Sequence, residues 1–166
     1  MEPKTITHTV LNHTIFCTDK EHTIRIDSTI KVKTTPNPNG TSPFVNYSTG
    51  FYIKVHNHAQ KGGEDFKVYL TPETTLSLAS HMLCQLDGTQ GENYEALTGR
   101  GGTNILRAGI TAKGPGLLIT IGGNEAFAPL NNNMLRGFAE LLKVTVANVE
   151  AGMLRMKMNA MFTRSR

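Results

Sequence analysis

The sequence predicts an α+β protein made of tandem β-β-β-β-α units, with two antiparallel four-stranded sheets and packed helices. Several stretches alternate apolar and polar residues with a period of two, which is typical of strands. Two other stretches have helical apolar spacing and follow a polar residue that can cap a helix. The connections between the strands are short, which favours antiparallel pairing. A chain of 166 residues can bury a sizeable core, and we expect one domain over residues 1–150.

Four strands are expected in the first unit, at residues 4–17, 23–34, 45–57 and 66–70. The first is either one strand or two strands broken near Asn12. The second is expected to bulge or bend near Asp27 and Ser28, where the apolar alternation is interrupted. A loop rich in Pro, Asn and Gly at residues 36–43 separates the second strand from the third.

A helix is predicted to follow the fourth strand and to run to about Leu86. Thr71 can cap it, Pro72 suits its first position, and Glu73 favours the positive end of its dipole. Its apolar residues recur near helical spacing and can cover one face of the strands. They are Leu76, Leu78, Ala79, Met82, Leu83 and Leu86.

The second unit is predicted to contain strands at residues 94–98, 104–113, 117–121 and 125–130. Asn131, Asn132 and Asn133 offer caps for a second helix from Met134 to about Val149. One face of this helix carries Leu135, Phe138, Ala139, Leu142 and Val146. A basic, Met-rich tail at 151–166 either packs on a partner chain or is partly disordered.

The two units match without a gap when Gly62 is placed over Gly122. The Gly-Gly turn then repeats, Leu70 falls over Leu130, and the cap residue Thr71 falls over Asn131. The order of strands, Gly-Gly turn, strand, cap and helix is therefore repeated. The repeats are predicted at about 4–86 and 93–150.

Composition limits the classes of function. The net charge is +4 and the pI is about 9.2, which is compatible with a phosphate-bearing partner. No apolar run approaches the roughly 18 residues that span a membrane. Without a signal-peptide pattern, we expect a cytoplasmic protein, or one in the host-cell cytoplasm if it is viral. Cys17 and Cys84 are expected to be reduced, buried thiols.

One face of the predicted first sheet combines aromatic and basic side chains. Tyr52 and Tyr69 are candidates for stacking on bases, and Lys54 and Lys67 for contact with phosphates. Further candidates on this and neighbouring strands are Arg25, Lys31, Lys33, His56, Arg107 and Lys113. The alternative is that these are ordinary solvent-facing strand residues, which are common in sheets.

Two stretches resemble a known family. Residues 68–82, VYLTPETTLSLASHM, and residues 104–121, NILRAGITAKGPGLLITI, are similar to segments of the Whirly proteins. One unit alone also resembles the positive-cofactor-four transcription coactivators. The resemblance implies binding of single-stranded nucleic acid across a sheet face, and assembly of a homo-oligomer through the helices. We place that interface at Leu78, Met82, Phe138 and Leu142. The chain has no Trp, so a viral or bacterial relative of this fold fits better than the plant family.

The expected function is binding of single-stranded nucleic acid, most simply DNA, with little sequence specificity. The role would be in transcription, replication or repair, as for a phage or bacterial transcription cofactor with an RNA polymerase as partner. The alternative is a structural or partner-binding oligomeric protein, such as a viral assembly component, that binds no nucleic acid. Discriminating between the two requires a binding measurement.

We expect neither an enzyme nor a cofactor. The spacing of His56 and His58 can chelate a metal, but no third ligand is apparent in the sequence and surface histidines are preferred. The Gly-rich turn at residues 99–102 lacks the strand–helix context and the Lys-Ser/Thr pair of a phosphate loop. No nucleophile elbow or pair of catalytic carboxylates is apparent.

Overall fold

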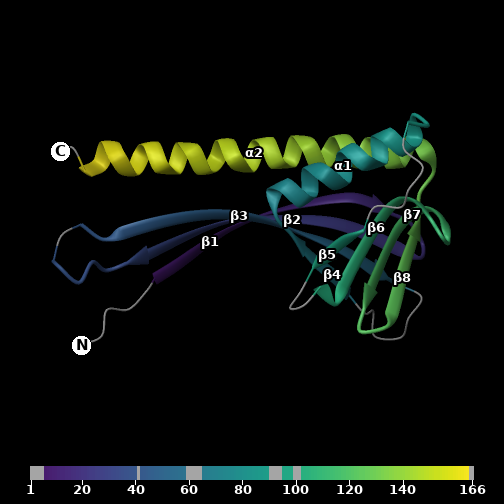
Figure 1. Ribbon diagram of the computed structural model, residues 1–166, viewed down its shortest axis with the longest axis horizontal. Helices are drawn as coiled ribbons and strands as arrows, with labels where there is room; N and C mark the ends of the chain where they lie inside the picture. Colours follow the sequence, from purple (N-terminus) through teal and green to yellow (C-terminus); the bar gives the residue numbers. More distant parts are fainter. Residues whose placement is uncertain (1–5, 41, 59–64, 90–94, 99–101, 165–166) are drawn as a thin grey trace.

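The computed structural model describes residues 6–40, 42–58, 65–89, 95–98 and 102–164, and contains two antiparallel four-stranded sheets and two helices (Figure 1). The first sheet has the order β1-β2-β3-β4, and the second has the order β5-β6-β7-β8. The elements are β1 (Ile6–Thr18), β2 (His22–Thr35), β3 (Phe44–Asn57), β4 (Asp65–Leu70), α1 (Pro72–Leu86), β5 (Ala96–Thr98), β6 (Asn104–Thr111), β7 (Gly114–Ile121), β8 (Asn124–Pro129) and α2 (Asn132–Arg164). The α+β class and the tandem order of four strands and a helix are confirmed.

The first sheet is longer than the second, because β1, β2 and β3 extend beyond the second sheet as an arm that runs alongside the C-terminal half of α2 (Figure 1). The strand β1 is continuous through Asn12. Of the bulge or bend expected near Asp27 and Ser28, the bulge is wrong, because β2 pairs with β1 and β3 in unbroken register there. The irregularity lies instead in β1, between Ile15 and Cys17.

Both predicted helix caps are present. The Thr71 hydroxyl accepts a hydrogen bond from the backbone N–H of Thr74 at 3.2 Å, at the start of α1. The side-chain oxygen of Asn131 accepts one from the N–H of Met134 at 2.9 Å, at the start of α2. Each cap satisfies a donor that the first helical turn leaves without an intrahelical partner.

The helices and both sheets share one hydrophobic core. Its fully buried side chains include four residues that we expected in an oligomer interface: Leu78, Met82, Phe138 and Leu142. In the single chain these side chains are enclosed between the helices and the sheets, so they form the intramolecular core rather than a surface for a partner. Apolar periodicity in the sequence identified the buried side of each helix, but not what covers it.

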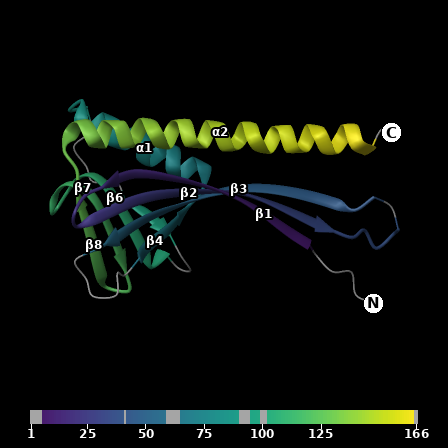
Figure 2. The same cartoon turned by 180° about the vertical axis from the view of Figure 1, so that it is seen from behind.

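The helix α2 continues well beyond the predicted end near Val149. Its 33 residues, at 1.5 Å each, give a length of roughly 50 Å. The predicted tail at 151–166 is therefore helical as far as Arg164, with no break at its start. The helix is supported there because Met153 and Met156 are partly buried and pack against the core. This part of α2 runs alongside the arm of the first sheet (Figure 2).

Some predicted features fall outside the described residues. These are the start of the first strand at 4–5, the Gly62-Gly63 turn, the start of the fifth strand at Tyr94, the Gly-rich turn at 99–101, and the last two residues of the tail. Cys84 is a free thiol and is half-buried rather than buried. Within the described ranges, no helix is long and apolar enough to cross a membrane.

We predict that Phe138→Ala lowers the free energy of unfolding by about 3–5 kcal/mol, because Phe138 is fully buried and its ring lies 5.0 Å from that of Phe16. Urea denaturation measures this loss. Leu76→Ala on α1 is the control, because Leu76 is partly exposed and should cost much less. Equal losses for the two variants would contradict the assigned core.

Candidate nucleic-acid interface

The first sheet has one face packed on the core and one face directed away from the helices, which we call the outer face (Figure 1). Phe51, Ile53 and Val55 of β3 are fully buried on the core side. Because strand side chains alternate, Tyr52 and Lys54 lie on the outer face. All eight predicted binding residues of this sheet share that face: Arg25, Lys31, Lys33, Tyr52, Lys54, His56, Lys67 and Tyr69.

The strand register arranges the outer face in rows. One row crosses all four strands through His13, Asp27, Tyr52 and Tyr69. The adjacent row contains Ile15 on β1, and then the three cations Arg25, Lys54 and Lys67. An aromatic pair therefore lies beside a line of positive charge, which is the combination that single-stranded nucleic acid requires.

Asp27 is the centre of an ion-pair cluster that the sequence did not predict. Its side chain is only 5% exposed. Its oxygens lie 2.5 Å from Lys54 Nζ and 2.6 Å from His13 Nδ1. The Arg25 guanidinium contacts both oxygens, at 2.9 Å from Nε and 3.1 Å from Nη2. One buried carboxylate therefore links β1, β2 and β3 and restrains two of the predicted phosphate-binding cations.

Two opposing effects set the pKa of Asp27. Burial raises it, because a charged carboxylate is less stable away from water. Hydrogen bonds from Lys54, His13 and Arg25, together with the positive charge of Lys54, outweigh burial, so the pKa is lowered below its ordinary value. The carboxylate is consequently ionised at neutral pH and holds its cations in place.

Tyr52 and Tyr69 lie next to each other on β3 and β4. Their ring centroids are 5.1 Å apart and the rings are inclined by 60°. Tyr69 is 38% exposed, and its hydroxyl donates a long hydrogen bond of 3.5 Å to the Thr49 carbonyl. The ring lies over Gly50, where a methyl group would overlap it. Gly50 therefore permits the position of Tyr69.

Two lysines of the outer face lie over the tyrosine rings. Lys67 Nζ is 3.9 Å from the centroid of the Tyr52 ring, and Lys31 Nζ is 5.9 Å from that of the Tyr69 ring. Such contacts at exposed sites stabilise by only about 0.5–1 kcal/mol. These lysine–ring contacts can therefore be exchanged for contacts with a ligand, in which a phosphate binds the lysines and a base stacks on the rings.

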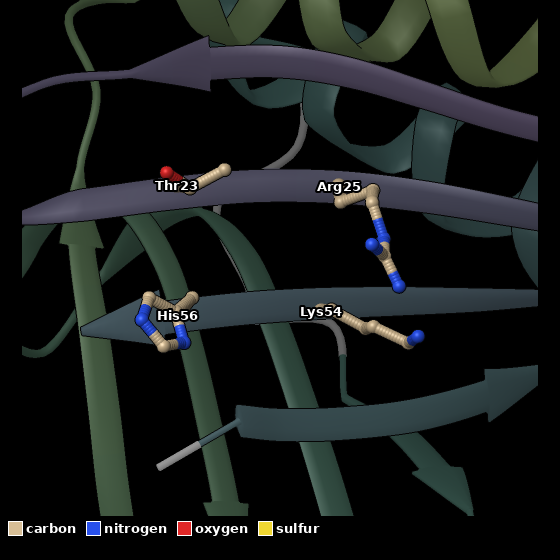
Figure 3. Close-up of a pocket in the computed structure, with 4 residues that line it drawn as sticks. All are labelled: Thr23, Arg25, Lys54 and His56. Atoms are coloured by element: carbon tan, nitrogen blue, oxygen red, sulfur yellow. The ribbon is translucent and has the colours of Figure 1, made fainter. Parts of the chain in front are cut away.

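A shallow hollow of about 280 Å³ lies in the rows next to that of the aromatic pair. It is lined by Thr23, Arg25, Lys54 and His56 (Figure 3). Three of these side chains carry nitrogen donors, so the hollow suits an anionic group such as a phosphate. The ring of His56 lies 4.8 Å from that of His58. Among the residues that the structure describes, no three His, Cys, Asp or Glu side chains are grouped to hold a metal ion.

The two candidates from the second sheet lie apart from the outer face and are paired with acids. Arg107 of β6 donates from Nε to Glu95 at 2.7 Å. Lys113, between β6 and β7, contacts Glu125 at 2.6 Å, and its hydrogen bond lowers the pKa of that carboxyl. Glu95 and Glu125 are exposed, so these ion pairs can open, but the two carboxylates reduce the positive potential of the second sheet.

Three residues that shape the interface were not among the predicted ones: His13, Asp27 and Gly50. A carboxylate between apolar strand positions is a signal for Asp27, but in the sequence it has the same pattern as a bulge. The roles of His13 and Gly50 depend on which residues face each other across the strands, and this register is not visible in a single sequence.

Comparison with protein-family models, curated proteins and solved structures gives no significant match to this chain.

We predict that Asp27→Asn lowers the free energy of unfolding by about 1–3 kcal/mol at neutral pH, because it leaves Lys54 and Arg25 without their anion. The folded-state pKa of Asp27 is lowered, so its contribution is complete above the unfolded value of about 3.9 and is lost as pH falls through the folded value.

Chemical denaturation from pH 7 to pH 3 measures this dependence. The difference between the wild type and Asp27→Asn should be constant above about pH 5 and should shrink below about pH 4. Glu140→Gln, an exposed control, should stay within about 0.5 kcal/mol of the wild type. A difference that grows on acidification would refute the assigned ion-pair cluster.

Proposed function

We propose that this protein binds single-stranded nucleic acid, most simply DNA, across the outer face, with little sequence specificity. The observation that carries the proposal is the Tyr52–Tyr69 pair, set among lysines on an uncovered sheet face. The resemblance of residues 68–82 and 104–121 to Whirly segments supports the same function.

Binding would combine stacking with neutralisation of phosphates. A base stacked on an aromatic side chain contributes about 1–3 kcal/mol, which exceeds the cation–π contact of Lys67 with Tyr52 that it would replace. The displaced lysine would then be free to contact a phosphate. Because every base has a flat face, this mode tolerates any sequence.

The charge of the outer face favours an anionic strand. Five cations and one carboxylate are present among its described side chains in β2, β3 and β4. Asp27 restrains Arg25 and Lys54, and these line the hollow as a fixed pair of donors. Lys31, Lys33 and Lys67 would provide the adjustable contacts along the backbone of the strand.

The proposed role is non-enzymatic and cytoplasmic, in transcription, replication or repair, with RNA polymerase as one candidate partner. The protein would act as a homo-oligomer that holds single strands open or protects them. RNA in place of DNA would be bound by the same chemistry, because neither stacking nor phosphate contact requires a particular sugar.

We predict that Tyr69→Ala weakens binding of a labelled oligo-dT by about 5- to 150-fold, which corresponds to about 1–3 kcal/mol. Fluorescence anisotropy measures the affinity, and the melting temperature checks the fold. Tyr47→Ala is the matched control, because Tyr47 is on the same strand but faces α2, where Lys157 lies over its ring. Equal affinities for the wild type and Tyr69→Ala would show that the aromatic pair is misassigned.

Binding should also weaken as salt rises, with a slope of about −0.7 in log affinity against log salt for each phosphate neutralised. Lys67→Ala should therefore make the slope about 0.7 less steep. If the wild type does not bind oligo-dT or oligo-U at low salt, the proposal fails, and the alternative of a structural or partner-binding oligomer is favoured.

A further inference from the structure

The helix α2 carries a second apolar stripe, which is separate from its core side. We call it the exposed stripe, and it consists of Val144, Ala147, Ala151, Leu154 and Met158, all exposed. Met161 has the next position of the pattern but lines a hollow with Val45 and Tyr47 of β3, so it is not part of the stripe. The intervals between these residues alternate between three and four, so the stripe repeats every seven residues. This is the a and d pattern of a coiled coil, with Val144 at a and Ala147 at d.

The exposed stripe lies on the side of α2 away from the sheets. Its residues interleave with the core-facing series, which consists of the buried Leu142, Val146 and Val149 and the partly buried Met153 and Met156. At 100° per residue the two series point in nearly opposite directions. The strands all lie on one side of α2 in both views (Figures 1 and 2). Three large side chains of the stripe are about half exposed: Val144, Leu154 and Met158.

The period of the stripe identifies the kind of partner that fits it. A stripe with a strict seven-residue repeat stays in contact with another helix only when the two helices supercoil around each other. The partner helix therefore needs an apolar stripe with the same period. A second copy of α2 has this period and an identical stripe. Around a twofold axis, each stripe residue would meet its own equivalent, and the small side chains of Ala147 and Ala151 would allow the helix backbones to approach closely.

The flanking charges indicate the relative direction of the two helices. Glu150 occupies a g position and Arg155 occupies the next e position, five residues further on. In a parallel coiled coil, a g residue of one helix lies beside the e residue five positions later on the other helix. Two symmetric pairs between Glu150 and Arg155 would therefore form in a parallel dimer.

We propose that two copies of this chain associate through the exposed stripe as a parallel coiled-coil dimer. The stripe spans 15 residues, roughly 22 Å of helix, and so covers about two heptads. This short contact predicts a dimer that dissociates on dilution. The proposal does not depend on nucleic-acid binding, because the stripe and the outer face lie on opposite sides of the molecule and both outer faces stay open in the dimer.

Sedimentation velocity over a range of protein concentrations tests the interface. The wild type should change from monomer to dimer as concentration rises, and Leu154→Glu should weaken dimerisation at least about tenfold, since it places a charge in the apolar contact. Leu76→Glu adds the same charge at an exposed leucine of α1 and should leave dimerisation unchanged. A wild type that stays monomeric, or a Leu154→Glu variant that dimerises normally, would overturn the proposal.

Charge reversal tests the direction of the helices. Glu150→Arg and Arg155→Glu should each weaken the dimer, and the double variant should restore it. Met158→Cys, at an a position, should form a disulfide-linked dimer under mild oxidation, because identical a residues meet in the parallel arrangement. Failure of the double variant to recover, or absence of the crosslink, would rule out the parallel dimer, and circular dichroism confirms that each variant is folded.

Discussion

The buried carboxylate of Asp27 is the interaction on which the outer face depends. It links His13 of β1, Arg25 of β2 and Lys54 of β3, and these four side chains lie in two adjacent rows of the sheet. Removing one partner from a buried ion pair is costly, because the remaining charge is left without compensation away from water. The cluster therefore fixes the positions of Arg25 and Lys54, which would otherwise sample many rotamers. It lies directly beside the aromatic pair of Tyr52 and Tyr69.

The ion pairs of Asp27 separate the cations of the outer face into two groups with different proposed roles. Arg25 and Lys54 are held by Asp27, so they define a hollow of fixed shape rather than a mobile charge. Lys31 and Lys67 lie over the rings of Tyr69 and Tyr52. These contacts are weak enough for a base to replace the lysine on the ring and for the lysine to bind a phosphate instead. The second sheet has the same order of elements, but Arg107 and Lys113 are paired with acids. The two units thus differ in surface chemistry although they share a topology.

The element order and helix caps could be predicted because they depend on local signals: alternation, Gly turns, and Thr71 and Asn131 before apolar helices. The predictions that failed concerned tertiary context. The polar pair at Asp27 and Ser28 interrupts the apolar alternation as a bulge would, and only the cross-strand partners show that the strand is regular there. The interface assigned to Leu78 and Phe138 was the core of one chain, because an apolar stripe does not reveal what covers it. The predicted end of α2 near Val149 is too early, because the Met-rich segment that follows is supported by packing against the arm rather than by propensity alone.

Photo-crosslinking most directly tests the claim that the outer face is the platform for single strands. The wild-type protein would be irradiated in complex with oligo-dT and the modified peptides identified by mass spectrometry. The account predicts crosslinks at Tyr52 and Tyr69, which lie in β3 and β4. Crosslinks confined to the second sheet or to α2, with Tyr52 and Tyr69 unmodified in a saturated complex, would contradict it.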